Sequence, residues 1–259
     1  MKVETVLAAV AEIGPFFRIG ELPNGSLDPA EALAALYRGG TALQSQLSTT
    51  ADTLGVPDGR VAGSIFFQSL AAKLWSPTLA VAVRDGQVLW LPPEATRLQG
   101  TGLACARPTL RTPRPTGSTG EPVGDTVRSG TVGSAPSGRQ PTPSDRVAAL
   151  AGELVRAVLD IHLRPLAAVL NVSPATLWGN AASAMAGSYQ VMTAARPELA
   201  APTLIHALLG TDSFAGTGGV DGSGRFQRNS CCLFYRVPGG GLCGDCVLRR
   251  RGFRTRPTD

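Results

Sequence analysis

The clearest periodic pattern of apolar and polar positions lies in the second half of the chain. Ser144 can cap a helix there. Apolar residues follow it at steps of three and four, at Val147, Leu150, Leu154, Val158 and Ile161. Because this spacing places the side chains on one helical face, it predicts an amphipathic helix with that face buried.

Two further helices are expected downstream. One begins at Ser173-Pro174, where proline suits the first helical position, and stops at Arg196-Pro197. The other covers roughly residues 198–209. The small residues of the first of these helices would let another helix approach closely. The whole stretch 144–224 is therefore predicted to be a helical region that ends in a glycine-rich loop.

The first hundred residues mix helical and extended patterns. Residues 3–13 have helical spacing, and residues 28–37 begin with a capping carboxylate and a first-turn proline. Residues 65–74 indicate a third helix, which should stop at Ser76-Pro77 because a residue before proline disfavours the helical conformation.

An extended pattern follows directly. Residues 79–83 and 87–91 are rich in strand-forming residues, and Asp85-Gly86 lies between them as a tight turn. This arrangement predicts a β-hairpin. Together with the preceding helices it defines an N-terminal region of residues 1–106.

Residues 107–143 differ in composition from both flanking regions. They consist mostly of Pro, Gly, Ser, Thr and Arg, with little to bury, which predicts a flexible linker or insertion. An ordered lid over a ligand stays open as the alternative. Residues 225–259 follow the helical region as a C-terminal segment. The expected fold class is α+β and mainly helical, with a β-hairpin near the start and a small loop domain at the end.

No integral membrane segment is expected. The longest apolar stretch, residues 147–170, is interrupted by charged residues at Glu153, Arg156, Asp160 and Arg164. The first seventeen residues contain Glu4 and Glu12 and offer no convincing secretory cleavage site. The expected compartment is therefore the cytoplasm, where thiols stay reduced.

The positive charge is concentrated near the C-terminus. The net charge is +5 at pH 7, and residues 221–259 hold eight arginines against three aspartates, a surplus equal to the charge of the whole chain. A basic segment can bind nucleic acid, an acidic membrane or another anionic partner. Its charge alone does not choose among them.

Four of the five cysteines lie within sixteen residues: Cys231, Cys232, Cys243 and Cys246. The spacing Cys-Cys-x10-Cys-x2-Cys is neither that of a usual zinc ribbon nor that of the common ferredoxins. A structural zinc site stays open. A thioredoxin-like redox pair at Cys-Gly-Asp-Cys is a further alternative, although no strand-helix unit precedes it.

A [2Fe-2S] cluster suits this spacing. Two neighbouring irons each take two thiolates, so the two cysteine pairs need not converge on one point. We assign Cys243 and Cys246 to one iron and Cys231 and Cys232 to the other. The glycines at 239–241 and Gly244 permit a tight loop and let backbone N–H groups approach the sulfurs. Nearby Arg228 and Arg236 would favour the more negative, reduced cluster and raise its reduction potential.

The segment "RNSCCLFYRVPGGGLCGDCVL" resembles the C-terminal signature of the FhuF-type ferric-siderophore reductases. The family's four cluster ligands match the four cysteines named above. "LWGNAASAMAG" from Leu177 and "LAAKLWSP" from Leu70 also resemble segments of that family. The stretch 107–143 departs from it, being longer than the family leads one to expect.

The resemblance implies an oxidoreductase of the cytoplasm that uses a [2Fe-2S] cluster to reduce iron(III) in an imported ferric siderophore, and it favours a hydroxamate-type siderophore. Association with the inner face of the membrane is compatible with this role. Hard oxygen donors hold iron(III) far better than iron(II), so a one-electron reduction releases the metal. The chain has no dinucleotide or P-loop fingerprint. Electrons are therefore expected from a ferredoxin, flavodoxin or flavin reductase.

Four residues are candidates for substrate binding. Arg228 and Arg236 could pair with anionic siderophore oxygens. Trp178 and Asn180 could line a siderophore cleft, with a core position as the alternative for Trp178. No acid or base residue is required for electron transfer beyond the cluster.

Two other function classes stay open. One is a non-enzymatic iron-sulfur or zinc protein whose basic C-terminus binds nucleic acid or an acidic partner. The favoured function, by contrast, involves no nucleic acid. The other is a siderophore-binding protein with a structural cluster. Outside the cysteine segment, His162 and His206 are interpreted as structural and Cys105 as an ordinary free thiol.

Overall fold

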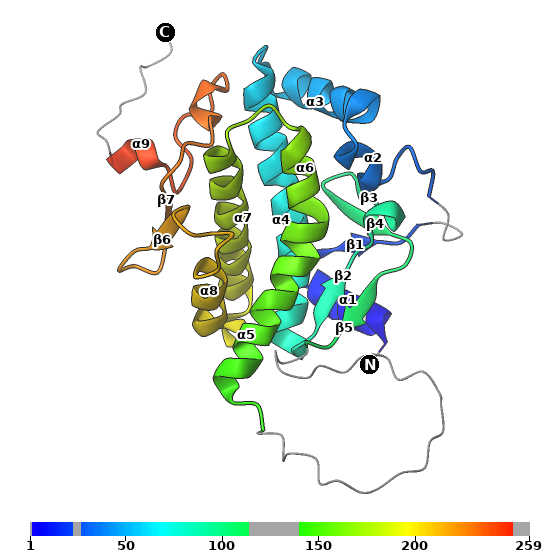
Figure 1. Cartoon of the computed structure of the whole chain (residues 1–259), viewed down its shortest axis with the longest axis vertical. Coiled ribbons are helices and arrows are strands. Elements are labelled where there is room, and N and C mark those ends of the chain that lie inside the picture. The colour runs from blue at the N-terminus through cyan, green and yellow to red at the C-terminus, as the bar shows by residue number, and fades with distance from the viewer. Residues whose placement is uncertain (1, 23–26, 114–139, 251–259) are drawn as a thin grey trace, which may run out of the picture.

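Two long parallel helices, α4 (Gly59–Asp85) and α7 (Pro174–Ala195), lie side by side at the centre of the protein (Figure 1). The computed structural model describes residues 2–22, 27–113 and 140–250. The small side chains of α7 allow the close approach predicted from the sequence, and the buried hydroxyls of Ser76 and Ser188 form a 2.9 Å hydrogen bond between the helices. The mainly helical α+β class is confirmed.

The other described helices surround this pair. They are α1 (Val3–Ala11), α2 (Leu33–Tyr37), α3 (Gly40–Leu54), α5 (Pro143–Leu154), α6 (Arg164–Val169), α8 (Pro202–Leu209) and α9 (Val247–Arg250), with a π-helical stretch (Val155–Leu163) between α5 and α6 and single 3-10 turns at Pro15–Phe17, Pro93–Ala95, Pro197–Leu199 and Phe234–Arg236. Large side chains of α4 are buried between these layers, among them Phe67, Leu70, Trp75 and Leu79. No helix in the described part of the chain is both long enough and apolar enough to cross a membrane.

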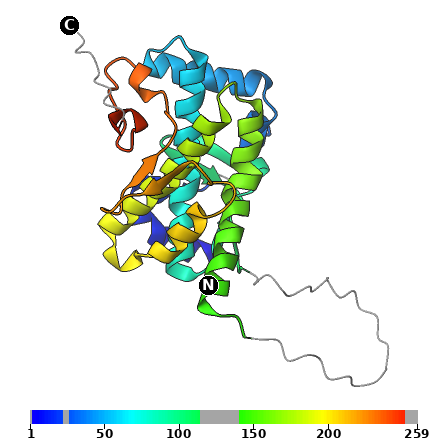
Figure 2. The ribbon, with the colours of Figure 1, turned by 60° about the vertical axis from the view of Figure 1, so that its left-hand side comes forward.

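Three small sheets complete the described fold. In the first, β4 (Gly102–Cys105) lies between β1 (Ile19–Gly20), to which it is parallel, and β3 (Thr96–Gln99), to which it is antiparallel. The second pairs β2 (Val88–Trp90) with β5 (Thr109–Arg111), and the third pairs β6 (Gly218–Val220) with β7 (Phe226–Arg228), both antiparallel. The β6–β7 hairpin lies against α7 and leads into the cysteine segment (Figure 2).

The predicted β-hairpin over 79–91 is wrong. Residues 79–83 continue α4, which passes through Pro77 instead of ending before it. Residues 79–82 are buried on all sides, so the burial of this apolar run against its neighbours outweighs the backbone hydrogen bond lost at proline. Gly86 has a left-handed backbone (φ 63°) and ends the helix, whereas a hairpin turn was expected there.

Several boundaries also differ from the prediction. The cap of α5 is Thr142, not Ser144, because Thr142 and Asp145 form a reciprocal capping box around a proline at the first helical position. The start of α7 after Ser173 is as predicted. Residues 109–111, assigned to the linker, form β5, and residues 114–139 of that predicted linker lie outside the described residues.

The buried His162 links three parts of the fold. Because the Leu91 carbonyl can only accept, His162 Nε2 donates to it at 2.9 Å, and Nδ1 then accepts from the Tyr37 hydroxyl at 2.7 Å. Burial lowers the pKa of His162 to about 3 and raises the pKa of Tyr37. His162 is thus a neutral structural residue.

Acid should destabilise the protein through His162. Its pKa is about 3 in the folded chain against an ordinary 6.5 when unfolded, so the unfolded state takes up the proton first as the pH falls. The free energy of unfolding should fall by about 2 kcal/mol from this group between pH 6.5 and about pH 5. Urea unfolding of the wild type and of His162→Gln at both pH values measures this contribution. An equal pH dependence in the two proteins would contradict it.

Candidate metal centre

The cysteine segment runs from β7 to α9 and packs on the N-terminal halves of α4 and α7 (Figures 1 and 2). A small apolar cluster joins it to α4, in which Val237 is buried against Val56, Val61 and Ala62. On α7, a Cβ at Gly179 would lie 2.1 Å from Ser230 Oγ. A side chain at position 179 would therefore displace the Ser230 hydroxyl, which now lies against the helix just before Cys231.

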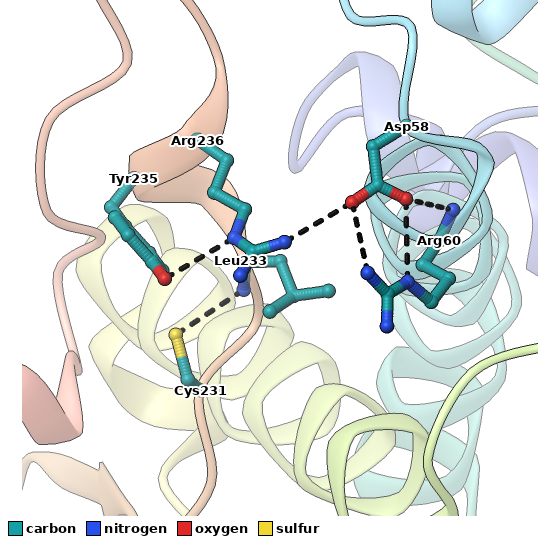
Figure 3. Close-up of polar contacts among 6 residues, drawn as sticks. All are labelled: Asp58, Arg60, Cys231, Leu233, Tyr235 and Arg236. Carbon is teal, nitrogen blue, oxygen red and sulfur yellow. Dashed lines mark hydrogen bonds and ion pairs between the residues drawn. The ribbon is translucent and has the colours of Figure 1, made fainter.

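An ion pair ties the outer side of the segment to the start of α4 (Figure 3). Arg236 donates to Asp58 Oδ2 at 3.1 Å, while Asp58 Oδ1 accepts the backbone N–H of Arg60 at 2.9 Å and so caps the helix. Arg236 Nε also donates to the Tyr235 hydroxyl at 3.2 Å. These contacts lower the pKa of Asp58, chiefly through the capping bond. Asp58 thus fixes both the helix start and the segment.

The two roles of Asp58 can be separated by mutation. Asp58→Ala removes cap and ion pair and should lower the free energy of unfolding. Asp58→Asn keeps a capping oxygen and loses only the charge, so its effect should be clearly smaller than that of Asp58→Ala. Chemical unfolding of the two variants beside the wild type gives both values. Equal losses in the two variants would refute this division.

A buried polar chain crosses the inner side of the segment, through Ser64, Asn180 and Arg228. Ser64 Oγ donates to the Cys232 carbonyl oxygen at 2.7 Å, and Asn180 Nδ2 donates to the carbonyl oxygen and Oγ of Ser64, both at 2.9 Å. Arg228 donates from NH1 to Asn180 Oδ1 at 2.7 Å and from Nε to Asp245 Oδ2 at 3.0 Å. The chain therefore connects the backbone of one cysteine pair to the loop of the other.

The four cysteines form no disulfide. Cys232 and Cys246 are buried, whereas Cys231 and Cys243 are partly exposed. One contact joins cysteines of different pairs, with 3.4 Å between Cys232 Sγ and Cys243 Sγ. Cys231 Sγ accepts the backbone N–H of Leu233 at 3.4 Å, as Figure 3 shows. Leu233 has a left-handed backbone (φ 69°), so the chain turns directly after the adjacent cysteines.

Proton affinity differs among these thiols. The proton shared between Cys232 and Cys243 lowers the pKa of Cys232 to about 6 and raises the pKa of Cys243, and the positive charge of Arg228 contributes to the first shift. Burial raises the pKa of Cys231. Metals bind the thiolate form, so a lowered thiol pKa is a property that favours ligation. As the side chains stand, the described residues include no group of three or more His, Cys, Asp or Glu that could hold a metal ion.

The predicted substrate residues fall into different places. Arg228 and Asn180 are fully buried in the polar chain, so neither side chain reaches solvent. Arg236 is partly exposed on the outer side. Trp178 is partly buried and lines a hollow of about 430 Å³, with the Arg164 guanidinium 5.2 Å from its ring centre. That hollow also reaches Ser230, beside Cys231.

Sequence reasoning missed several residues that position the segment: Asp58, Ser64 and Asp245. Asp58 precedes a helix and carries a capping signal, but nothing in its surroundings indicates a partner 178 residues downstream. Ser64 is one of many serines in a helical pattern. Asp245 has the most direct signal, because it stands between Cys243 and Cys246.

The cysteine segment has a counterpart among known protein families. Residues 228–248 match the family model described as the FhuF 2Fe-2S C-terminal domain. The matched range begins at Arg228 and includes all four cysteines. No curated protein matches the chain. The match confirms the resemblance found in the sequence and points to a [2Fe-2S] cluster as the cofactor.

Proposed function

We propose that the protein reduces iron(III) in ferric siderophores by one electron and releases iron(II), with Cys231, Cys232, Cys243 and Cys246 as the ligands of a [2Fe-2S] cluster. The observation that carries this proposal is the family match over the cysteine segment. By itself, the match indicates an iron-sulfur protein of the ferric-siderophore reductase type.

The residues present fit such a cluster. Four free thiols lie in one short segment, and a sulfur of the first pair touches a sulfur of the second. The buried Arg228 supplies a positive charge close to thiols that must become thiolates. The N–H of Leu233 points at one of the sulfurs. Thiolate ligands with N–H donors and a nearby cation are what an iron-sulfur cluster requires.

The 3.4 Å contact joins the two sequence pairs. Thiolates that hold one metal group lie close together, because each metal–sulfur bond is only about 2.3 Å long. Since Cys232 and Cys243 come from different pairs, we propose that both pairs would hold the same cluster.

A [2Fe-2S] cluster held by the four cysteines would supply one electron for iron(III), and hard oxygen ligands hold the resulting iron(II) far less tightly. The polypeptide holds the two cysteine pairs in register through the buried polar chain. The sequence makes Arg228 a candidate for substrate binding. In this proposal it acts instead as a buried positive charge that favours the reduced state of the cluster. Asn180 orients Arg228, while Trp178 and Arg236 keep proposed roles near the substrate.

The reductant is proposed to be a separate ferredoxin, flavodoxin or flavin reductase, and the proposed compartment is the cytoplasm, at or near the inner face of the membrane. The absence of a dinucleotide or P-loop fingerprint in the sequence supports an external donor. For the type of siderophore, the family resemblance alone favours a hydroxamate.

Iron release tests the proposed function. Anaerobically purified protein is reduced with dithionite, freed of excess reductant and mixed with a ferric trihydroxamate or a ferric tricatecholate in the presence of an iron(II)-specific chromophoric chelator. The expected result is one iron(II) per reduced protein, formed together with loss of the reduced-cluster spectrum. Tight binding without iron(II) formation would favour a siderophore-binding protein. Zinc in place of iron would favour a structural zinc site.

A further inference from the structure

Two hollows meet at Gly244, on the side of the cysteine segment that faces the β6–β7 hairpin. The larger, of about 640 Å³, is lined by the hairpin, Gly244 and Arg249. The smaller, of about 170 Å³, lies between α7 and the hairpin and reaches Asp245. Arg225 and Gly244 line both. We call this continuous surface the Gly244 groove.

Gly244 provides close access to the cysteines. It is exposed, and nothing lies within 4 Å of the position that a Cβ would take. It follows Cys243 directly and precedes Cys246 by two residues. A molecule in contact with the Gly244 backbone would therefore lie beside two residues proposed as cluster ligands. Short separation favours electron transfer.

The groove carries two exposed arginines from different elements. Arg225 is at the start of the second hairpin strand, and Arg249 is in α9, where it donates to the Leu242 carbonyl oxygen at 3.1 Å. Neither takes part in any ion pair formed among the described residues. A guanidinium group that is not engaged in an ion pair can bind anionic oxygens bidentately.

Two carboxylates line the groove as well, Asp221 in the larger hollow and Asp245 in the smaller. Asp221 Oδ1 accepts from the N–H and hydroxyl of Ser223 and from the N–H of Arg225, and its Oδ2 accepts from Gln227. These bonds, the Ser223 hydroxyl first, lower the pKa of Asp221 to about 2. Asp221 therefore braces the hairpin with its oxygens already engaged. Asp245 is paired with the buried Arg228 at 3.0 Å, so Arg225 and Arg249 outweigh Asp221 and leave the groove with a positive surplus.

We propose that the Gly244 groove binds anionic ferric chelates, with Arg225 and Arg249 contacting the negatively charged donor oxygens of the chelator. This inference rests on the proposed function and adds a substrate class to it. The larger hollow lies within the range of about 300 to 1,000 Å³ that is usual for small-molecule sites. The groove therefore selects a catecholate or carboxylate chelate over the uncharged hydroxamate type that the family resemblance favours.

Gallium(III) complexes separate binding from electron transfer, because gallium(III) resembles iron(III) in size and charge but is not reduced. Calorimetric titration of the cluster-loaded protein with a gallium(III) tricatecholate and a neutral gallium(III) trihydroxamate gives both affinities. The tricatecholate should bind more tightly, and its affinity should fall as salt rises. Arg225→Gln or Arg249→Gln should weaken it about fivefold, and the double variant about 20-fold. Arg38→Gln, an exposed arginine just after α2, is the matched control and should bind as the wild type does.

Wild-type affinity in the double variant, or a preference for the neutral complex, would overturn the groove assignment. The assignment would also be wrong if the double variant bound the tricatecholate normally but accepted electrons more slowly from an acidic ferredoxin. The groove would then bind the electron-donor protein and not the chelate. The proposed function fails separately, if the wild type binds the gallium complex but produces no iron(II) from the ferric one.

Discussion

Replacing Cys243 with serine is expected to remove the cluster and with it all ferric-siderophore reduction. Cys243 is one of four thiols in the matched segment, and its sulfur lies 3.4 Å from that of Cys232. A serine hydroxyl is far less acidic than a thiol and a much poorer ligand for iron at neutral pH. Iron and sulfide content and the visible spectrum of the anaerobically purified variant measure the loss. Iron(II) release should fall to the level without protein.

Cys105→Ser is the matched control for this experiment. Cys105 is the fifth cysteine; it is buried in β4, away from the cysteine segment, and its sulfur accepts from Thr96 Oγ1 at 3.3 Å. Its replacement should leave iron and sulfide content unchanged. A Cys243→Ser protein that keeps a full cluster, or keeps activity without one, would refute the ligand assignment.

The second large effect is expected at Arg228. Replacing it with methionine leaves Asp245 and Asn180 Oδ1 without the donors that now satisfy them, in a site where the arginine itself is fully buried. Breaking a buried ion pair on one side costs about 3 to 5 kcal/mol. Chemical unfolding of Arg228→Met should show a loss of this size. Arg236→Gln, in a partly exposed pair, should lose no more than about 1 kcal/mol.

A second measurement separates charge from packing at Arg228. Arg228→Lys keeps a positive charge near the cysteines but cannot reproduce both bonds of the guanidinium. Its reduction potential should stay nearer that of the wild type, whereas the potential of any folded Arg228→Met protein should be more negative. Equal potentials in all three proteins would contradict the electrostatic role, even if stability changed as expected.

The sequence was most informative where a local pattern sets the structure. The spacing of the four cysteines led to the cluster before any fold was known, because ligand spacing is a property of a few consecutive residues. The start of α7 at Ser173-Pro174 was found for the same reason. The position of Arg228 near the cysteines also made it a candidate site residue. Its role as a buried partner of Asp245 could not be predicted from that position.

The secondary-structure predictions that were wrong concern elements that depend on contacts between distant segments. Pro77 continues α4 because the residues around it are buried against other elements, which outweighs its local preference for ending a helix. Residues 88–90 form a strand, but their partner is 109–111 and not the preceding run. Helix α3 was missed because Leu43 is its only fully buried residue, so its sequence shows little apolar periodicity.

The most direct test is the EPR spectrum of anaerobically purified protein, recorded after reduction with dithionite and again after one equivalent of a ferric siderophore is added. A [2Fe-2S] cluster that reduces the siderophore predicts an S = 1/2 signal on reduction that disappears on addition, as iron(II) is formed. A reduced protein with no such signal, or a signal that the ferric siderophore leaves unchanged, would contradict the proposed function.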